Sequence, residues 1–196
     1  MSSVKKARPD DLGAFLTEFD KKTLLPLVPL LGITFVLDSV FSLQPPWPQY
    51  STYATAFFEL CTLFIAFFTP IRSKKKLLRW QIFAFVMVTL TFVGYFVLYS
   101  FFVFETPLTG ERVVAGFQCT RDAALHVAPA FGETCPFLTE EVLSAAQYEA
   151  ELVWTAPSVR TVETAMFLTW SGFFVFATFL FGISVAYMSR LPKRSA

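Results

Sequence analysis

The stretch 80-WQIFAFVMVTLTFVGYFVLYSFFVF-104 decides the fold, because its 25 residues include no charged side chain. An α-helix of roughly 20 apolar residues crosses the hydrocarbon core of a bilayer, which is about 30 Å thick. Backbone N–H and C=O groups find no water in that core, so a helix, which pairs them internally, is the expected structure. The stretch therefore predicts a membrane-spanning helix over Trp80–Phe104.

Three further segments have the same character. Ala165–Met188 carries no charge, whereas Thr23–Leu43 and Tyr53–Ile71 each contain one acid. The chain as a whole is 55% hydrophobic and contains 25 Phe, a composition that suits lipid contact better than a water-soluble surface. The sequence therefore predicts an all-α membrane protein built on a four-transmembrane-helix bundle.

The basic residues predict the orientation of this bundle. Of the 16 Lys and Arg residues, only three lie in the segment 105–163, namely Arg112, Arg121 and Arg160. The other 13 lie in the N-tail, in the run 72-RSKKKLLR-79 and at the C-terminal end. Because Lys and Arg collect on the cytoplasmic side, both termini are expected there, in a plasma or inner membrane. The run could also bind acidic lipid headgroups.

This orientation divides the chain into four parts. Residues 1–22 form a cytoplasmic N-tail with a short amphipathic helix, and residues 23–104 hold the first three spans. The segment 105–163 lies outside, and residues 164–196 hold the last span and the C-tail. In the outer segment we expect a short strand near 111-ERVVAGFQCT-120 and one helix from Thr139 onward. Pro157 is expected to break the chain, and Ser158 to cap the last span.

Two cysteines of the outer segment are the natural partners of a disulfide. Cys119 and Cys135 lie on the predicted outer side, where disulfides persist. Such a bond stabilises a loop of this size by about 3 kcal/mol on the chain-entropy estimate. The segment between helices 3 and 4 is therefore predicted to be a small, mixed, disulfide-stapled extracytoplasmic domain. Cys61, inside the second span, is expected to be a buried small apolar residue.

The only histidine, His126, lies between these cysteines in the pattern C-x₆-H-x₈-C. Structural zinc sites use tightly spaced C-x₂₋₄-C pairs, so no metal site is expected. Asp122 lies four residues earlier and could orient the imidazole on a helix. No nucleophile motif accompanies the pair, so no catalytic residue and no cofactor are predicted.

The two intramembrane acids are the strongest functional candidates. Asp38 and Glu59 lie near the outer ends of the first two spans, and acids in such positions are costly and often functional. One hypothesis is a carboxylate pair that shares a proton, or binds a cation or a cationic ligand. The alternative is that both reach water through the headgroups or a wet bundle mouth, with Arg112 or Arg160 nearby.

The last span carries a stripe of small residues at four-residue intervals: Thr178, Gly182 and Ala186. Such stripes allow close helix contact, within one chain or between chains.

These features favour a non-enzymatic interaction or assembly component that works through its outer domain. Its expected partners are the lipid bilayer and either another protein or further copies of itself, with no nucleic acid. The alternative is an oligomeric pore, channel subunit or membrane-permeabilising effector that uses Asp38 and Glu59. A thiol-redox enzyme ranks third, because the chain has no C-x-x-C pair.

Overall fold

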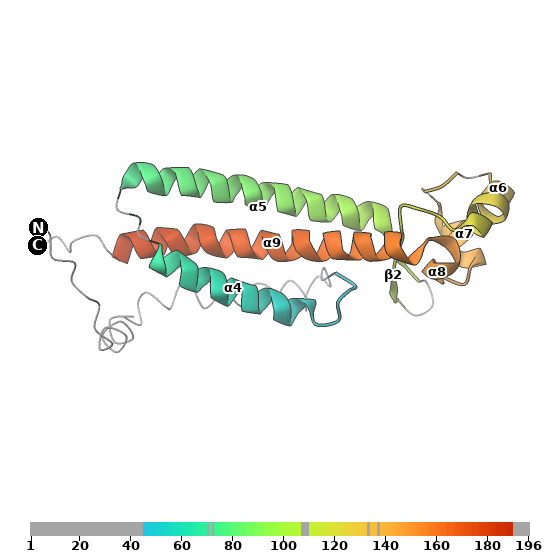
Figure 1. Cartoon of the computed structure of the whole chain (residues 1–196), viewed down its shortest axis with the longest axis horizontal. Helices are drawn as coiled ribbons and strands as arrows, with labels where there is room; N and C mark the ends of the chain where they lie inside the picture. Colours follow the sequence, from blue (N-terminus) through green and yellow to red (C-terminus); the bar gives the residue numbers. More distant parts are fainter. Residues whose placement is uncertain are drawn as a thin grey trace, which may run out of the picture.

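The computed structural model describes residues 45–69, 71, 73–106, 110–132, 134–136 and 138–189. It is mostly helical, with long helices side by side and a small compact unit at one end (Figure 1). The predicted span 23–43, the N-tail 1–22 and residues 190–196 lie outside the described residues.

Three helices in the described part are long and apolar enough to cross a membrane. They are α4 (Ser51–Phe68), α5 (Lys74–Phe102) and α9 (Ala156–Ser189). They correspond to the second, third and fourth predicted spans. The helical character is thus present in the structure, and three of the four predicted spans correspond to helices that could cross a membrane.

The residues next to each helix end explain where α4 stops and where α5 begins. Helix α4 stops at Phe68 because Thr69, which precedes Pro70, is extended. Helix α5 begins within the lysine run, where the Ser73 hydroxyl accepts a hydrogen bond from the Lys76 amide.

The predictions for Pro157 and Ser158 were wrong, because both lie inside the last long helix. Helix α9 begins at Ala156 and crosses the predicted boundary between residues 163 and 164. Pro157 does not break the chain but occupies the first turn, where no backbone N–H is needed. Ser158 lies inside the helix, and its hydroxyl donates to the carbonyl oxygens of Thr155 and Gln118.

Helix α9 packs against both α4 and α5. Contacts between α5 and α9 pair early residues of one helix with late residues of the other, so these helices are antiparallel. A Cβ atom added to Gly172 would lie 3.1 Å from Thr91 Cγ2, and the Gln81 amide donates to the Ser184 hydroxyl at 2.9 Å. Four aromatic pairs continue this interface: Trp80–Phe179, Phe83–Phe176, Phe92–Phe173 and Tyr95–Trp170.

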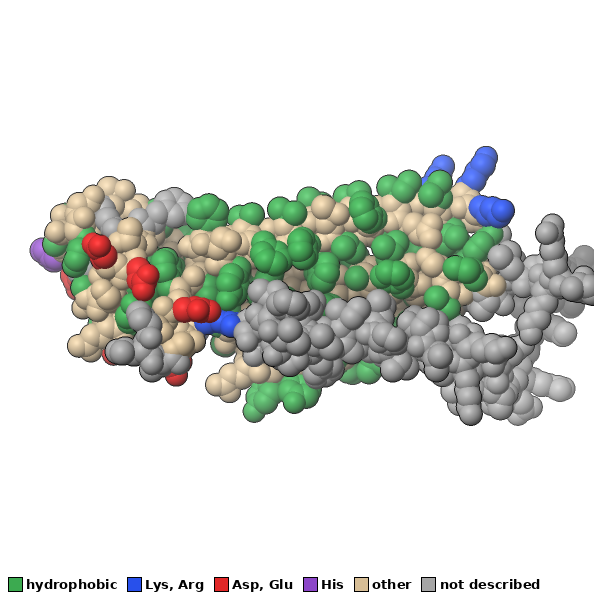
Figure 2. All heavy atoms as spheres, turned by 180° about the vertical axis from the view of Figure 1, so that it is seen from behind, with side chains coloured by type: hydrophobic (Ala, Val, Ile, Leu, Met, Phe, Trp, Pro, Cys, Tyr) green, Lys and Arg blue, Asp and Glu red, His purple; other side chains and the backbone are tan. Residues whose placement is uncertain are grey.

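The outer surface of the helices is apolar. Phe85 and Leu90 of α5 are 62% and 61% exposed, and Phe64 of α4 is 63% exposed. Figure 2 shows hydrophobic side chains along the length of the helices, with charged groups gathered at the two ends. An apolar surface of this extent is unfavourable in water and matches a hydrocarbon environment. The structure is therefore consistent with an integral membrane protein.

The compact unit comprises residues 103–155 and is called the disulfide unit below. Strand β1 (Val103–Glu105) continues directly from α5 and pairs antiparallel with β2 (Arg112–Val114). The predicted strand character of this stretch is present in β2. The remaining elements are short helices: η1 (Ala123–Val127, a π-helix), α6 (Ala128–Ala130), α7 (Glu140–Ala145) and α8 (Ala150–Val153).

The single helix predicted from Thr139 onward is in fact two helices. Thr139 precedes α7 as expected, but Gln147 and Tyr148 adopt φ values of 54° and 61° and end the helical run. The Tyr148 amide donates to the Leu143 carbonyl, a bond typical of a Schellman helix end. The chain then turns into α8.

Candidate functional site

A buried polar seam lies between α4 and α9. The hydroxyl oxygens of Thr55 and Ser171 lie 3.0 Å apart and form a hydrogen bond between these helices. Further along, a Cβ atom added to Gly182 would lie 2.9 Å from Ala66 Cβ. Residue numbers in both helices increase from the first contact to the second, so α4 and α9 are parallel. We define the polar seam as Thr55, Glu59, Ser171 and Thr178.

Glu59 is the acid of this seam. It lies four residues after Thr55 and seven before Ala66, on the face of α4 that contacts α9. Its side chain is 0% exposed. It lies eight residues into α4, or about 12 Å along the helix axis. Glu59 is therefore buried among protein atoms of the chain, and whether it reaches water through the headgroups or a wet bundle mouth stays open.

The buried carboxyl group of Glu59 is the ionisable group of the polar seam. Burial of an acid within a membrane-spanning helix is costly, and such groups commonly mark proton relays or ion paths. Thr178 precedes Gly182 by one turn and is also buried, so hydroxyl groups lie on the α9 side. Asp38 lies outside the described residues, so its predicted meeting with Glu59 stays a prediction.

The predicted stripe of small residues packs against α4 of the same chain. Gly182 meets Ala66 and Leu63, and Ala186 clusters with Phe67. Thr178 is 1% exposed. The close approach allowed by the stripe is thus used within the chain. Sequence reasoning left the partner helix open and missed the Thr55–Ser171 bond, for which the only signal was a hydroxyl one turn before Glu59.

Arg112 is engaged at the junction between α5 and the disulfide unit. Its Nε lies 3.4 Å from Glu105 Oε1, across the β1–β2 pair. Its guanidinium carbon lies 5.9 Å from the centre of the Tyr99 ring, within the range of a cation–π contact. These contacts give Arg112 an acidic partner in Glu105 and an aromatic one in Tyr99.

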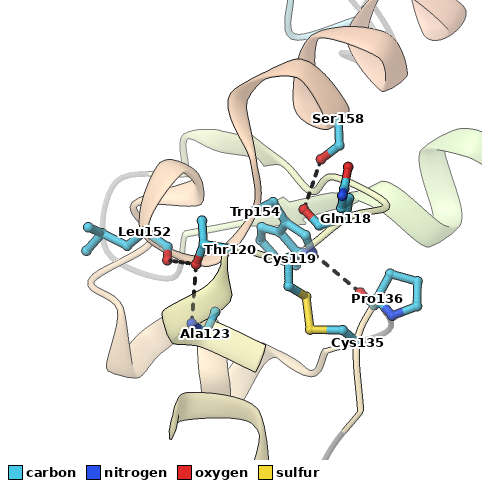
Figure 3. Close-up of a disulfide and its surroundings, with 9 residues drawn as sticks. All are labelled: Gln118, Cys119, Thr120, Ala123, Cys135, Pro136, Leu152, Trp154 and Ser158. Atoms are coloured by element: carbon cyan, nitrogen blue, oxygen red, sulfur yellow. Dashed lines mark hydrogen bonds between the residues drawn. A yellow bond between two sulfur atoms is a disulfide. The ribbon is translucent and has the colours of Figure 1, made fainter. Parts of the chain in front are cut away.

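A disulfide joins Cys119 to Cys135, the pairing that the sequence predicts. It lies beside Trp154, whose indole N–H donates to the Pro136 carbonyl oxygen (Figure 3). Backbone bonds hold the two segments together, because the Thr120 amide donates to Val153 and the Thr155 amide to Gln118. The core of the unit also includes Ala115, Ala123, Ala128, Leu138, Val142, Leu143 and Val153. Trp154, which the sequence did not single out, is its largest fully buried side chain.

His126 stands apart from this core. Its side chain is exposed in η1, and a π-helical turn spaces hydrogen bonds five residues apart, so the four-residue spacing to Asp122 does not set a shared face. The two cysteine sulfurs are used in the disulfide and offer no thiolate to a metal. Among the described residues, no group of three potential metal ligands comes together.

The expectation for Cys61 was wrong. Its side chain is exposed on α4, among apolar side chains that also face outward. A small apolar residue is tolerated on a lipid-facing surface as well as in a core, which the sequence pattern cannot distinguish.

The cysteines allow a direct test of the pairing. The chain has three cysteines, so the unfolded, unreduced protein should react with one equivalent of maleimide, at Cys61. After reduction the count should rise to three. Mass spectrometry of the labelled peptides checks both counts, and labelling of Cys119 without reductant would contradict the disulfide.

The charged residues outside the seam separate along the long axis. Lys74, Lys75 and Lys76 lie at the start of α5, at the end of the helices away from the disulfide unit. Figure 2 shows basic side chains at that end and most of the visible acidic side chains at the other.

Comparisons with protein-family models, curated proteins and solved structures found no match.

Proposed function

We propose that this chain is a four-pass membrane protein that acts as a non-enzymatic interaction or assembly component. In this proposal both termini are cytoplasmic, and the disulfide unit is an extracytoplasmic domain that binds another protein or a second copy. The membrane is the plasma or inner membrane.

The observation that carries this proposal is the exposure of large apolar side chains on the disulfide unit. Four large apolar side chains of the unit are between 44% and 57% exposed: Phe117, Leu125, Phe131 and Leu152. The core of the unit and the residues packed against it do not include these four side chains. Exposed apolar side chains on a water-facing domain favour contact with a protein partner.

Photo-crosslinking tests the partner role. A photoreactive amino acid at Leu125 or Leu152 of the full chain should give one adduct of defined mass in native membranes. The same amino acid at Ser144, an exposed polar position on α7, is the matched control and should give much less. Equal yields at the three positions, or no adduct at Leu125 and Leu152, would reject the partner role.

Cysteine accessibility tests the orientation separately. In a Cys61→Ala background, a cysteine at Ser144 should react with a membrane-impermeant maleimide in intact cells. A cysteine at Ser73 should react only after the cells are opened, because it belongs to the lysine-rich end. The reverse pattern would invert the proposed topology.

Glu59 favours a second candidate function, an oligomeric pore or ion path lined by the polar seam. Its buried carboxyl group would be the group that exchanges a proton or contacts a cation. In that role Asp38 would be a further acid of the path.

Glu59→Gln should abolish proton or cation flux in liposomes while the protein stays folded. Glutamine keeps the size and shape of the side chain but has no charge and no proton to exchange. The matched control is Glu163→Gln, the same change at a partly exposed acid of α9, and it should keep the flux. Flux measured with a pH-sensitive or ion-sensitive dye that persists in Glu59→Gln would exclude the path.

A further inference from the structure

An apolar cavity of about 250 Å³ lies where α5 meets the disulfide unit. The end of α5 contributes Ser100, Phe101 and Phe102 to its lining, and the unit contributes Ala115, Leu138 and Trp154. Neither the polar seam nor the proposed protein-binding surface includes this cavity. The cavity between α5 and the disulfide unit is therefore separate from both of these sites.

The position of the cavity along α5 places it at the boundary of the membrane. Trp80 and Tyr99 are aromatic residues of the kind that mark the two membrane surfaces. They lie 19 residues apart on one helix, or about 29 Å, close to the thickness of a hydrocarbon core of about 30 Å. Ser100, Phe101 and Phe102 follow Tyr99 directly, so the cavity lies at the level where acyl chains meet the headgroups.

The cavity is lined on its α5 side by exposed residues. Phe101 and Ser100 are both exposed on α5, and Phe101 is 59% exposed among the other outward-facing apolar side chains. By contrast, Leu138 and Trp154 at its inner wall are 5% and 1% exposed. A hydrocarbon chain in the bilayer could thus enter past Phe101 and reach the inner wall.

The lining residues are mainly apolar and favour contact with a hydrocarbon. An enclosed apolar cavity of about 150 Å³ has room for benzene, so a space of about 250 Å³ has room for a segment of an acyl chain. An empty cavity would deprive its lining of dispersion contacts. We propose that this cavity binds an acyl chain of a bilayer lipid, which links the disulfide unit to the surrounding membrane. The inference rests on the proposed membrane placement of the chain, and not on the partner role.

Photolabelling with a lipid tests the proposal. The full chain is placed in dioleoylphosphatidylcholine vesicles containing a small fraction of phosphatidylcholine with a diazirine on one acyl chain. After illumination, mass spectrometry should find label on Leu138 and Trp154, although both are buried from the bulk bilayer. Phe96 and Val97, which are 38% and 48% exposed on α5, should be labelled by the surrounding lipid.

A variant that fills the entrance separates the cavity from the general lipid surface. Ser100→Trp should lower the labelling of Leu138 and Trp154 by about tenfold, equivalent to about 1.4 kcal/mol of binding free energy. Thr89→Trp is the matched control, because Thr89 is exposed and lies three turns away on the same face of α5. It should leave the labelling unchanged, and the maleimide count should confirm that both variants keep the disulfide.

Each result decides the matter. Label confined to Phe96 and Val97 would overturn the lipid site while supporting the membrane placement. Label on Leu138 and Trp154 that Ser100→Trp does not reduce would also overturn it. No label at any of the four positions would overturn both the lipid site and the membrane placement.

Discussion

Trp154→Ala should unfold the disulfide unit locally while the disulfide itself remains. Trp154 is 1% exposed and packs in the core beside Cys119 and Cys135. Truncation of a buried Trp to Ala costs about 3–5 kcal/mol, because the lost burial and the new cavity both destabilise. Here the new space would join the 250 Å³ cavity that Trp154 already borders.

Amide hydrogen exchange measures this loss where it should occur. The amides of Thr120 and Thr155 donate to Val153 and Gln118, so they report on the contact of the two segments beside Trp154. A loss of 3 kcal/mol should speed their exchange by about 100-fold, provided local opening governs exchange. Leu152→Ala is the matched control: the side chain is 57% exposed, and the change should stay within about 0.5 kcal/mol. Unchanged protection in Trp154→Ala would mean that the core is not organised around this residue.

Gly182→Leu should separate α4 from α9 and open the polar seam. Even a Cβ atom at position 182 would lie 2.9 Å from Ala66 Cβ, so a leucine there forces the helices apart. Overpacking of this kind costs about 2–3 kcal/mol. The hydroxyls of Thr55 and Ser171, 3.0 Å apart, should then lose contact.

A cysteine pair detects the separation. In a Cys61→Ala background, Thr55→Cys and Ser171→Cys should form a disulfide that joins α4 to α9, and Gly182→Leu should reduce its yield. Phe181→Leu introduces the same residue at an adjacent position that is 52% exposed, and it should leave the yield intact. Ala66→Gly should restore contact in a Gly182→Ala variant, because it removes the methyl group that the new Cβ would meet. Failure of this rescue would contradict the proposed contact.

The helical architecture could be predicted from sequence because long charge-free runs leave the backbone few alternatives in a membrane. The helix ends could not, because they depend on single neighbours. Pro157 is compatible with both the end and the first turn of a helix, and Gln118 must lie nearby before the Ser158 hydroxyl can donate to its carbonyl. The disulfide followed from a compartment argument that required no structure.

The site was only partly predictable for a related reason. Glu59 attracted attention as a lone acid in an apolar span, but its burial depends on which helix α4 packs against. Gly182 identified a surface of close approach without identifying Ala66 as its partner. In the disulfide unit, the elements are too short for periodicity to show which faces are buried, so the role of Trp154 emerged only from the fold.

Helix α9 connects the disulfide unit directly to the opposite end of the helices. It runs for 34 residues, or about 51 Å, from directly beside Trp154 to the end that carries the lysine run. The same continuous helix therefore connects the disulfide unit to the lysine-rich end and contributes Ser171 and Thr178 to the polar seam on the way.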